Sequence, residues 1–380
     1  MTAHAHNEAQ WQSQVLWRYR ALALALVGLL AVGFGVLGVT QVATSVHNAQ
    51  VYQRAKTLAS LSFAVTGLAA HLQDERDLTM QYIGQGLHGR LGTLDGSMGI
   101  ASQNLSLVQQ VQRLTDPWVR KVLADSAAVG AGYQAQVQQD AADVVALLKL
   151  LDPRRVAATS TALPAVDVMS SYTSMIDGLL SLDHNIALGS DDVVLSGDVA
   201  SLNLVSLIGE ETSEQRGLLA NALAAQGHFD PTTLSDLLTV QVQQEANVAE
   251  FDRVATPQQV ALYNDTVQGS LVSFATSYEQ QAIATGQANG TLNKLAPTAN
   301  DWYGAMSTGT IGSIRAVEQD LVTATIARAS ALRRNATVAT SVIGAALVIA
   351  LVLALLLMAL VGLGVIDQRR APSLRTTALG

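Results

Sequence analysis

Two arginine residues, Arg76 and Arg216, occur in segments whose neighbouring inward positions are apolar. On a helical wheel of 100° per residue, Arg76 lies about 30° from the centre of a stripe that includes Leu68 and Leu72. Arg216 lies about 40° from the centre of a second stripe, which includes Leu219. Both side chains are therefore predicted to lie inside a helical bundle or at a seam between bundles.

An arginine in such a place needs a partner, because burying an unpaired charge costs free energy. A small anion is one candidate, since the planar guanidinium group matches the oxygens of carboxylate, nitrate or phosphate. A carboxylate from the chain itself is the other, and Glu75, Asp183 and Glu214 are the candidates. On the same wheel Asp74 and Asp77 point away from the apolar stripe.

Other residue types offer less chemistry. Arg315 points away from the apolar stripe of its segment and is predicted to lie at the surface. The seven histidines have no metal-ligand spacing, and the absence of cysteine excludes thiol nucleophiles and zinc–thiolate sites. No phosphate-binding glycine loop or catalytic grouping is present, so we predict a non-enzymatic chain without metal or cofactor.

The intervening residues predict an all-α fold. Only 4% of the residues are aromatic, and helix-forming residues dominate. Asp116-Pro117, Asp152-Pro153, Asp230-Pro231 and Thr256-Pro257 each place a capping side chain before a proline, which is typical of helix starts. Eight helices are predicted, at 46–85, 95–114, 117–149, 164–189, 197–226, 231–253, 257–287 and 299–335, and these favour two four-helix bundles at about 46–189 and 197–335.

A weak internal repeat supports this division. The segment from Leu72 to Gly86 resembles the segment from Thr212 to Gly227. Each contains an acidic or amide residue followed by arginine, then a leucine, then a glycine about ten residues after the arginine. One repeat in each bundle would place one arginine in each half of the domain.

Two long apolar segments flank the helical region. Residues 21–43 and 338–366 carry no charged side chain and are long enough to span a bilayer. Arginines precede the first segment and follow the second, which favours cytoplasmic ends at 1–20 and 367–380. The domain at 46–336 is then extracytoplasmic, and the net charge of −8 argues against a nucleic-acid partner.

The segments LAAHLQDERDLTMQYIGQG, IGEETSEQRGLLANALAAQGHFD and DWYGAMSTGTIGSIRAVEQDL resemble the nitrate- and nitrite-sensing domain of bacterial membrane sensors. The resemblance covers about Val51 to Ala336 and implies two helical bundles with an anion between them. It places Arg76 and Arg216 as anion ligands. The first motif differs from the usual family form, because Asp77 stands where glycine commonly follows the arginine.

The resemblance further implies a sensor input module that passes a conformational signal across the membrane. Such domains commonly belong to two-component histidine kinases, act as dimers and precede a HAMP linker. The tail from Arg369 to Gly380 is similar to the start of that linker, and a kinase or other output module is expected as a separate or following partner. The alternative is a ligand-free, membrane-anchored helical adaptor or structural protein.

Overall fold

The computed structural model describes residues 53–54, 56–86, 98–160, 163–188, 193–225, 231–289, 292 and 298–328, with single positions beyond residue 328. The regular structure of these residues is helical, so the predicted all-α class is confirmed. Contacts divide the chain into two compact units, one at 54–330 and one that combines the chain ends at 1–53 and 331–380. The predicted spans at 21–43 and 338–366 lie outside the described residues, apart from single positions of the second.

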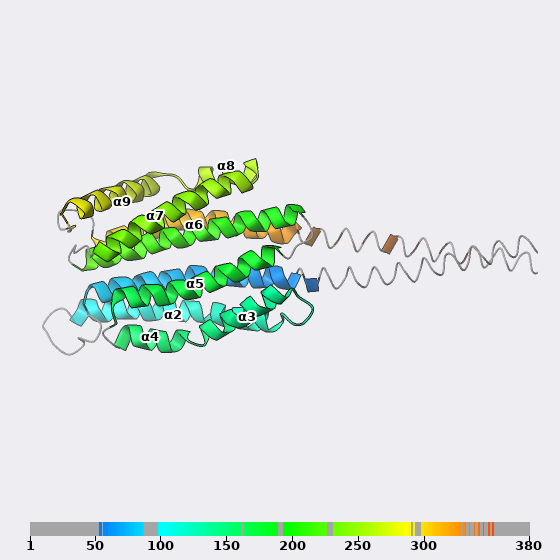
Figure 1. Ribbon diagram of the computed structural model, residues 1–380, viewed down its shortest axis with the longest axis horizontal. Helices are drawn as coiled ribbons and strands as arrows, with labels where there is room; N and C mark the ends of the chain where they lie inside the picture. The colour runs from blue at the N-terminus through cyan, green and yellow to red at the C-terminus, as the bar shows by residue number, and fades with distance from the viewer. Residues whose placement is uncertain are drawn as a thin grey trace, which may run out of the picture. The chain divides into compact units, whose positions relative to one another are not determined.

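The helices of residues 54–330 form two groups (Figure 1). The first contains the helix at 56–84, α2 (Met98–Ala127), α3 (Ala135–Leu148), α4 (Leu151–Ser160) and α5 (Ala165–Leu188). The second contains α6 (Val193–Ala224), α7 (Pro231–Val254), α8 (Pro257–Thr266), α9 (Ser270–Asn289), α10 (Ala299–Met306), the π-helix η1 (Ser307–Ile311) and the helix at 312–328. If α3 with α4, and α8 with α9, are each counted as one interrupted helix, each described group has the four helical segments of a four-helix bundle.

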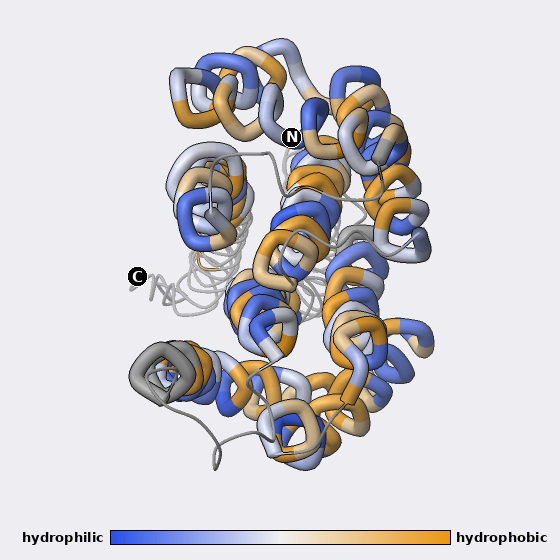
Figure 2. Tube along the Cα trace, turned by 90° about the vertical axis from the view of Figure 1, so that its left-hand side faces the viewer, coloured by the Kyte–Doolittle hydropathy of each residue, from blue (hydrophilic) through white to orange (hydrophobic). Residues whose placement is uncertain are grey.

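The seam between the groups is built around α6. This helix contacts α5 of the first group and α7, α10 and η1 of the second. One hydrophobic core includes residues of both groups, among them Leu72, Leu179, Leu219 and Trp302. Apolar and polar residues alternate around most helices (Figure 2), as expected for helices that each bury one stripe.

Local signals explain several helix ends. Thr256 accepts a hydrogen bond from the amide of Gln259, whose side chain accepts one from the amide of Thr256, so the predicted capping box is confirmed. Gly86 follows the helix at 56–84 with a φ of 66°, a conformation that favours glycine.

The predicted boundary at Asp116-Pro117 is wrong, because α2 continues through Pro117. Asp116 does not cap a helix there, and its carboxylate accepts a hydrogen bond from Arg155 at 2.8 Å. Trp118 packs so closely on Gly67 of the helix at 56–84 that a Cβ at Gly67 would lie 2.1 Å from the Trp118 ring. A proline inside a helix removes one amide donor and crowds the carbonyl group four residues earlier, and the contacts of Asp116 and Trp118 offset that cost.

Two predicted helices are instead divided. The segment at 117–149 turns between Ala127 and Ala135, where Gly130 and Gly132 disfavour a continuous helix. The segment at 257–287 breaks between α8 and α9 at Gly269, whose φ is 115°.

Among the described residues, α6 alone is long and apolar enough to cross a membrane by length and composition. Half of its apolar window is buried within the protein. A core helix meets the same criteria, and the polar contacts of α6 described below are those of a core helix.

Candidate functional site

The two repeat segments lie side by side at the seam. Asn221 of α6 donates a hydrogen bond from Nδ2 to the carbonyl oxygen of Met80 at 2.9 Å. A Cβ at Gly84 would lie 2.7 Å from the carbonyl oxygen of Asn221, so the glycine allows the two helices to approach closely. Arg76 and Arg216 are both fully buried, which confirms the predicted inward placement of both side chains.

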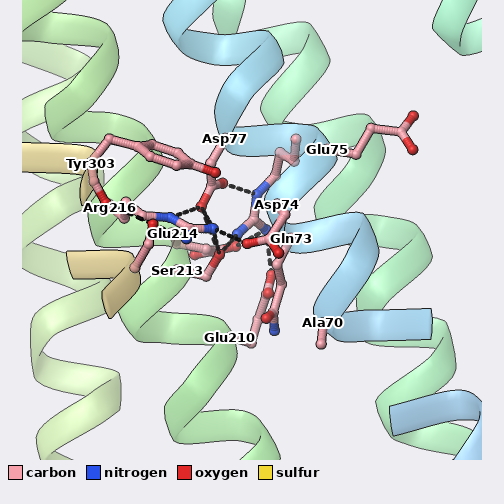
Figure 3. Close-up of polar contacts among 12 residues, drawn as sticks. Ala70, Gln73, Asp74, Glu75, Asp77, Glu210, Ser213, Glu214, Arg216 and Tyr303 are labelled. Atoms are coloured by element: carbon pink, nitrogen blue, oxygen red, sulfur yellow. Dashed lines mark hydrogen bonds and ion pairs between the residues drawn. The ribbon is translucent and has the colours of Figure 1, made fainter. Parts of the chain in front are cut away.

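Asp77 joins the two arginines (Figure 3). Its Oδ1 accepts a hydrogen bond from Nε of Arg76 at 2.9 Å, and its Oδ2 accepts one from Nε of Arg216 at 2.9 Å. Ser213 donates a third hydrogen bond to Oδ2 at 2.7 Å. Asp77 is fully buried although it lies off the predicted apolar stripe, so this helix buries a second, polar face.

Arg76 also contacts residues of α5 and α6. Its Nη1 donates to Thr173 at 2.9 Å and to Glu210, and it lies 3.6 Å from a carboxylate oxygen of Glu214. Burial alone would lower the pKa of Arg76, but these carboxylates and Asp77 outweigh burial and raise it. The guanidinium group is therefore charged throughout the accessible pH range.

Arg216 contacts the final helical segment of the second group. Its Nη1 donates to Ser307 of η1 at 2.8 Å, and its Nη2 donates to Asp74 at 2.8 Å. The guanidinium carbon lies 4.5 Å from the centre of the Tyr303 ring, and Trp302 donates from its indole nitrogen to the carbonyl oxygen of Arg216 at 3.1 Å. The π-helix η1 begins at Ser307, which accepts this hydrogen bond from Arg216. Single π-helical turns occur frequently at functional sites.

Arg315 is a third arginine of the same cluster: its side chain is 30% exposed, but it pairs with Asp74, which its predicted surface position did not include. It donates from Nη1 and Nη2 to the two oxygens of Asp74 at 2.9 and 3.0 Å, and from Nη2 to the carbonyl oxygen of Ala70 at 2.8 Å. The helical wheel identified the face of this helix that packs within its own bundle. At the seam, the opposite face of this helix packs against the neighbouring bundle. The apolar periodicity of one helix cannot predict that contact.

Burial and opposite charges together set the protonation of the cluster. Although burial acts in the other direction, Arg315 and Arg216 lower the pKa of Asp74 to about 2. Burial raises the pKa of Glu210 to about 8, because the opposing effect of Arg76 is smaller. Burial also raises the pKa of Tyr303, so its hydroxyl is neutral.

The carboxylates predicted as arginine partners are mostly engaged elsewhere. Glu75 points away from the cluster (Figure 3) and forms two hydrogen bonds with Arg155, at 2.7 and 2.8 Å. Asp183 accepts a hydrogen bond from Ser62. Of the three candidates only Glu214 lies within ion-pair distance of one of the two arginines.

The sequence interpretation therefore missed most of the site: Asp74, Asp77, Glu210, Ser213, Tyr303, Ser307 and Arg315. One signal was available. Glu210 and Glu214 occur in α6, the one described helix that is long and apolar enough to span a membrane, and carboxylates in such a helix need a partner. Within the described residues, no cluster of three or more metal-binding side chains occurs.

A small cavity of mixed polar and apolar lining adjoins Arg315. It has a volume of about 10 Å³, and its wall includes Thr66, Gln73, Ser206 and Glu318. This is room for about one water molecule. Arg76 and Arg216 do not line this cavity, and both are fully buried with their guanidinium groups bound to the chain's own carboxylates.

Comparison with known proteins agrees with this architecture. The family model for nitrate and nitrite sensing matches residues 67–326, a range that contains all three arginines of the cluster. The solved structure of the NasR transcription antiterminator superposes with a TM-score of 0.65 at 20% identity, over 85% of this chain and 82% of that chain. At this identity the likeness concerns the fold alone. No curated protein matches the sequence.

Proposed function

Because the chain belongs to the nitrate- and nitrite-sensing family, we propose that its arginine cluster binds a small anion such as nitrate or nitrite and that binding starts a signal. The observation that carries this proposal is the meeting of Arg76 and Arg216 at one seam, where both contact Asp77. Arg315 joins them through Asp74. Three guanidinium groups from three helices offer planar donor edges to an anion and link its presence to bundle packing.

The same three helices provide a route for the signal. Arg76 and Arg315 belong to the helices at 56–84 and 312–328, which are the helices nearest in sequence to the two proposed membrane spans. A ligand that favours one packing of these helices over another by about 1–3 kcal/mol would shift the signalling equilibrium usefully. We assign the chain on this basis to the input side of a membrane sensor, with a kinase or similar module as the output partner and a homodimer as the working form.

Isothermal titration calorimetry of the purified full chain tests anion binding. Nitrate and nitrite are titrated at constant ionic strength, with chloride as the reference anion. We expect saturable binding by the wild type and none by Arg76→Ala or Arg216→Ala. Arg253→Ala is the matched control, because Arg253 is exposed and, among the described residues, forms its ion pair with neighbouring Glu250 in α7. An absence of heat with both anions, from a folded wild-type chain, would refute the ligand assignment.

Membrane topology has its own test, since the chain contains no cysteine. Single cysteines are introduced by Gln136→Cys, at an exposed position of α3, and by Ser13→Cys and Thr376→Cys near the chain ends. A membrane-impermeant maleimide should label position 136 in intact cells and the other two only after permeabilisation. Labelling of all three in intact cells, or of none, contradicts the proposed topology.

A ligand-free adaptor is the second candidate function. The observation in its favour is that Arg76 and Arg216 are already paired with carboxylates of the chain. A purely structural cluster would give no anion binding in the wild type, and its loss would lower stability without a change in anion response. The calorimetric experiment therefore separates the two functions.

A further inference from the structure

The carboxylate of Asp77 lies between the two arginines in the manner expected of a bound anion. It is fully buried and takes hydrogen bonds from Arg76 and Arg216 through different oxygens. We propose that Asp77 is an internal ligand of the anion site, so that an external anion binds only by displacing this carboxylate. This inference rests on the proposed function and identifies Asp77 as the residue that determines the affinity of the site.

The two repeats of this chain differ at the position that makes this contact. Asp77 follows Arg76 in the first repeat, and Gly217 follows Arg216 in the second. A Cβ at Gly217 would lie 2.7 Å from Oδ1 of Asp77 and 3.0 Å from its Cγ. The glycine therefore makes the space that the Asp77 side chain fills, and a residue without a side chain at position 77 would leave that space open beside both guanidinium groups.

The count of charged groups in the cluster also supports the role of Asp77 as an internal ligand. Three guanidinium groups, of Arg76, Arg216 and Arg315, face four carboxyl groups: Asp74, Asp77, Glu210 and Glu214. Even with Glu210 protonated, three carboxylates already match the three positive charges. An added anion would then be a buried charge without a counter-charge, which is unfavourable. Without the charge of Asp77, one positive charge is left to bind a monoanion.

The geometry also selects the class of ligand. Asp77 presents a planar group with one negative charge, and it receives the Nε donors of two guanidinium groups and the hydroxyl of Ser213. A ligand that takes over these donors is a planar monoanion with two or three oxygens, such as nitrate, nitrite or formate. Sulfate is tetrahedral and doubly charged, so it meets neither condition.

Calorimetric titration of the full chain with sodium nitrate, formate and sulfate tests the inference. The variants are Asp77→Asn, which keeps the shape and removes the charge, and Asp77→Gly, which opens the space. If Asp77 leaves the site in about one molecule in ten, its removal should strengthen nitrate binding about tenfold, because the apparent affinity is reduced by the fraction of competent molecules. Nitrate should also raise the melting temperature of either variant more than that of the wild type.

Asp143→Asn is the matched control, because Asp143 is an exposed acid of α3 remote in sequence from the cluster, and it should leave nitrate affinity unchanged. Equal nitrate affinity in the wild type and in a folded Asp77 variant overturns the internal-ligand inference and leaves the proposed function intact. Weaker binding by both variants also overturns it, since Asp77 would then support the anion. Absence of nitrate and nitrite binding by the folded wild type refutes the proposed function itself, and binding by an Asp77 variant alone does not restore it.

Discussion

Replacement of Arg216 by methionine tests how strongly the seam depends on its charged cluster. Methionine keeps an unbranched stem but removes the hydrogen bonds to Asp74, Asp77 and Ser307 and the contact with the Tyr303 ring. Removal of one partner from a buried ion pair costs about 3–5 kcal/mol. Because Asp74 keeps Arg315 and Asp77 keeps Arg76, we expect a loss near the lower limit, about 3 kcal/mol of unfolding free energy.

For a domain of this size, about 3 kcal/mol corresponds to a fall of about 6 °C in the melting temperature. Far-UV circular dichroism of the full chain during heating and in denaturant measures both quantities. Asp77→Asn alone and combined with Arg216→Met completes a double-mutant cycle. Because the two side chains share a hydrogen bond, the double variant should lose about 1 kcal/mol less than the two single losses together.

Additive losses, within about 0.5 kcal/mol, would refute the direct coupling of Arg216 to Asp77. A melting temperature that does not change in Arg216→Met would refute the wider reasoning that this seam is held by buried charge. Arg253→Met is the control for the general effect of losing an arginine. Its guanidinium group is exposed, so the variant should melt at the wild-type temperature.

Three further predictions concern buried groups of the same unit. Burial raises the pKa of Asp183 to about 6, so the folded chain holds a proton that the unfolded chain releases. The contribution of Asp183 to stability should therefore be greatest below pH 4 and fall by about 3 kcal/mol between pH 4 and pH 6, and Asp183→Asn should remove this share of the pH dependence in denaturant titrations. Gly217→Ala should cost about 1–2 kcal/mol in the wild-type chain, since its Cβ crowds Asp77, and the same substitution should cost nothing when it is added to the Asp77→Gly variant, as measured in a thermal melt. Arg155→Met should cost about 3–5 kcal/mol by leaving the buried Glu75 without its counter-charge, although Tyr172 still donates to it, and Glu75→Gln should recover part of that loss in the same assay.

Each of these predictions has a contrary outcome. A pH profile that is the same in Asp183→Asn as in the wild type would show that this carboxyl group is ionised in the folded protein. A Gly217→Ala loss that persists when Asp77→Gly is added to the same chain would place the crowding elsewhere. A full-sized loss in both the single and the double Arg155 variants would mean that packing of the arginine stem, rather than the buried charge, stabilises this contact.

Local signals in the sequence were sufficient for much of the secondary structure. The capping box at Thr256, the glycine stop at Gly86 and the start of α7 at Pro231 depend on residues within a few positions of one another. The failure at Pro117 has a tertiary cause, because contacts of Asp116 and Trp118 with other helices hold α2 continuous through the proline. Local propensity is weak against packing of this kind.

The sequence by itself determined the all-α class, the family resemblance and the inward placement of Arg76 and Arg216. It predicted that each arginine needs a partner but did not identify Asp77, because hydrophobic periodicity describes one buried face of one helix. Helices at the seam are covered on more than one side, so the polar residues on their second face are buried as well. Only the tertiary structure, which aligns the two repeats side by side, decided that Asp77 occupies the space beside Gly217 and joins both arginines.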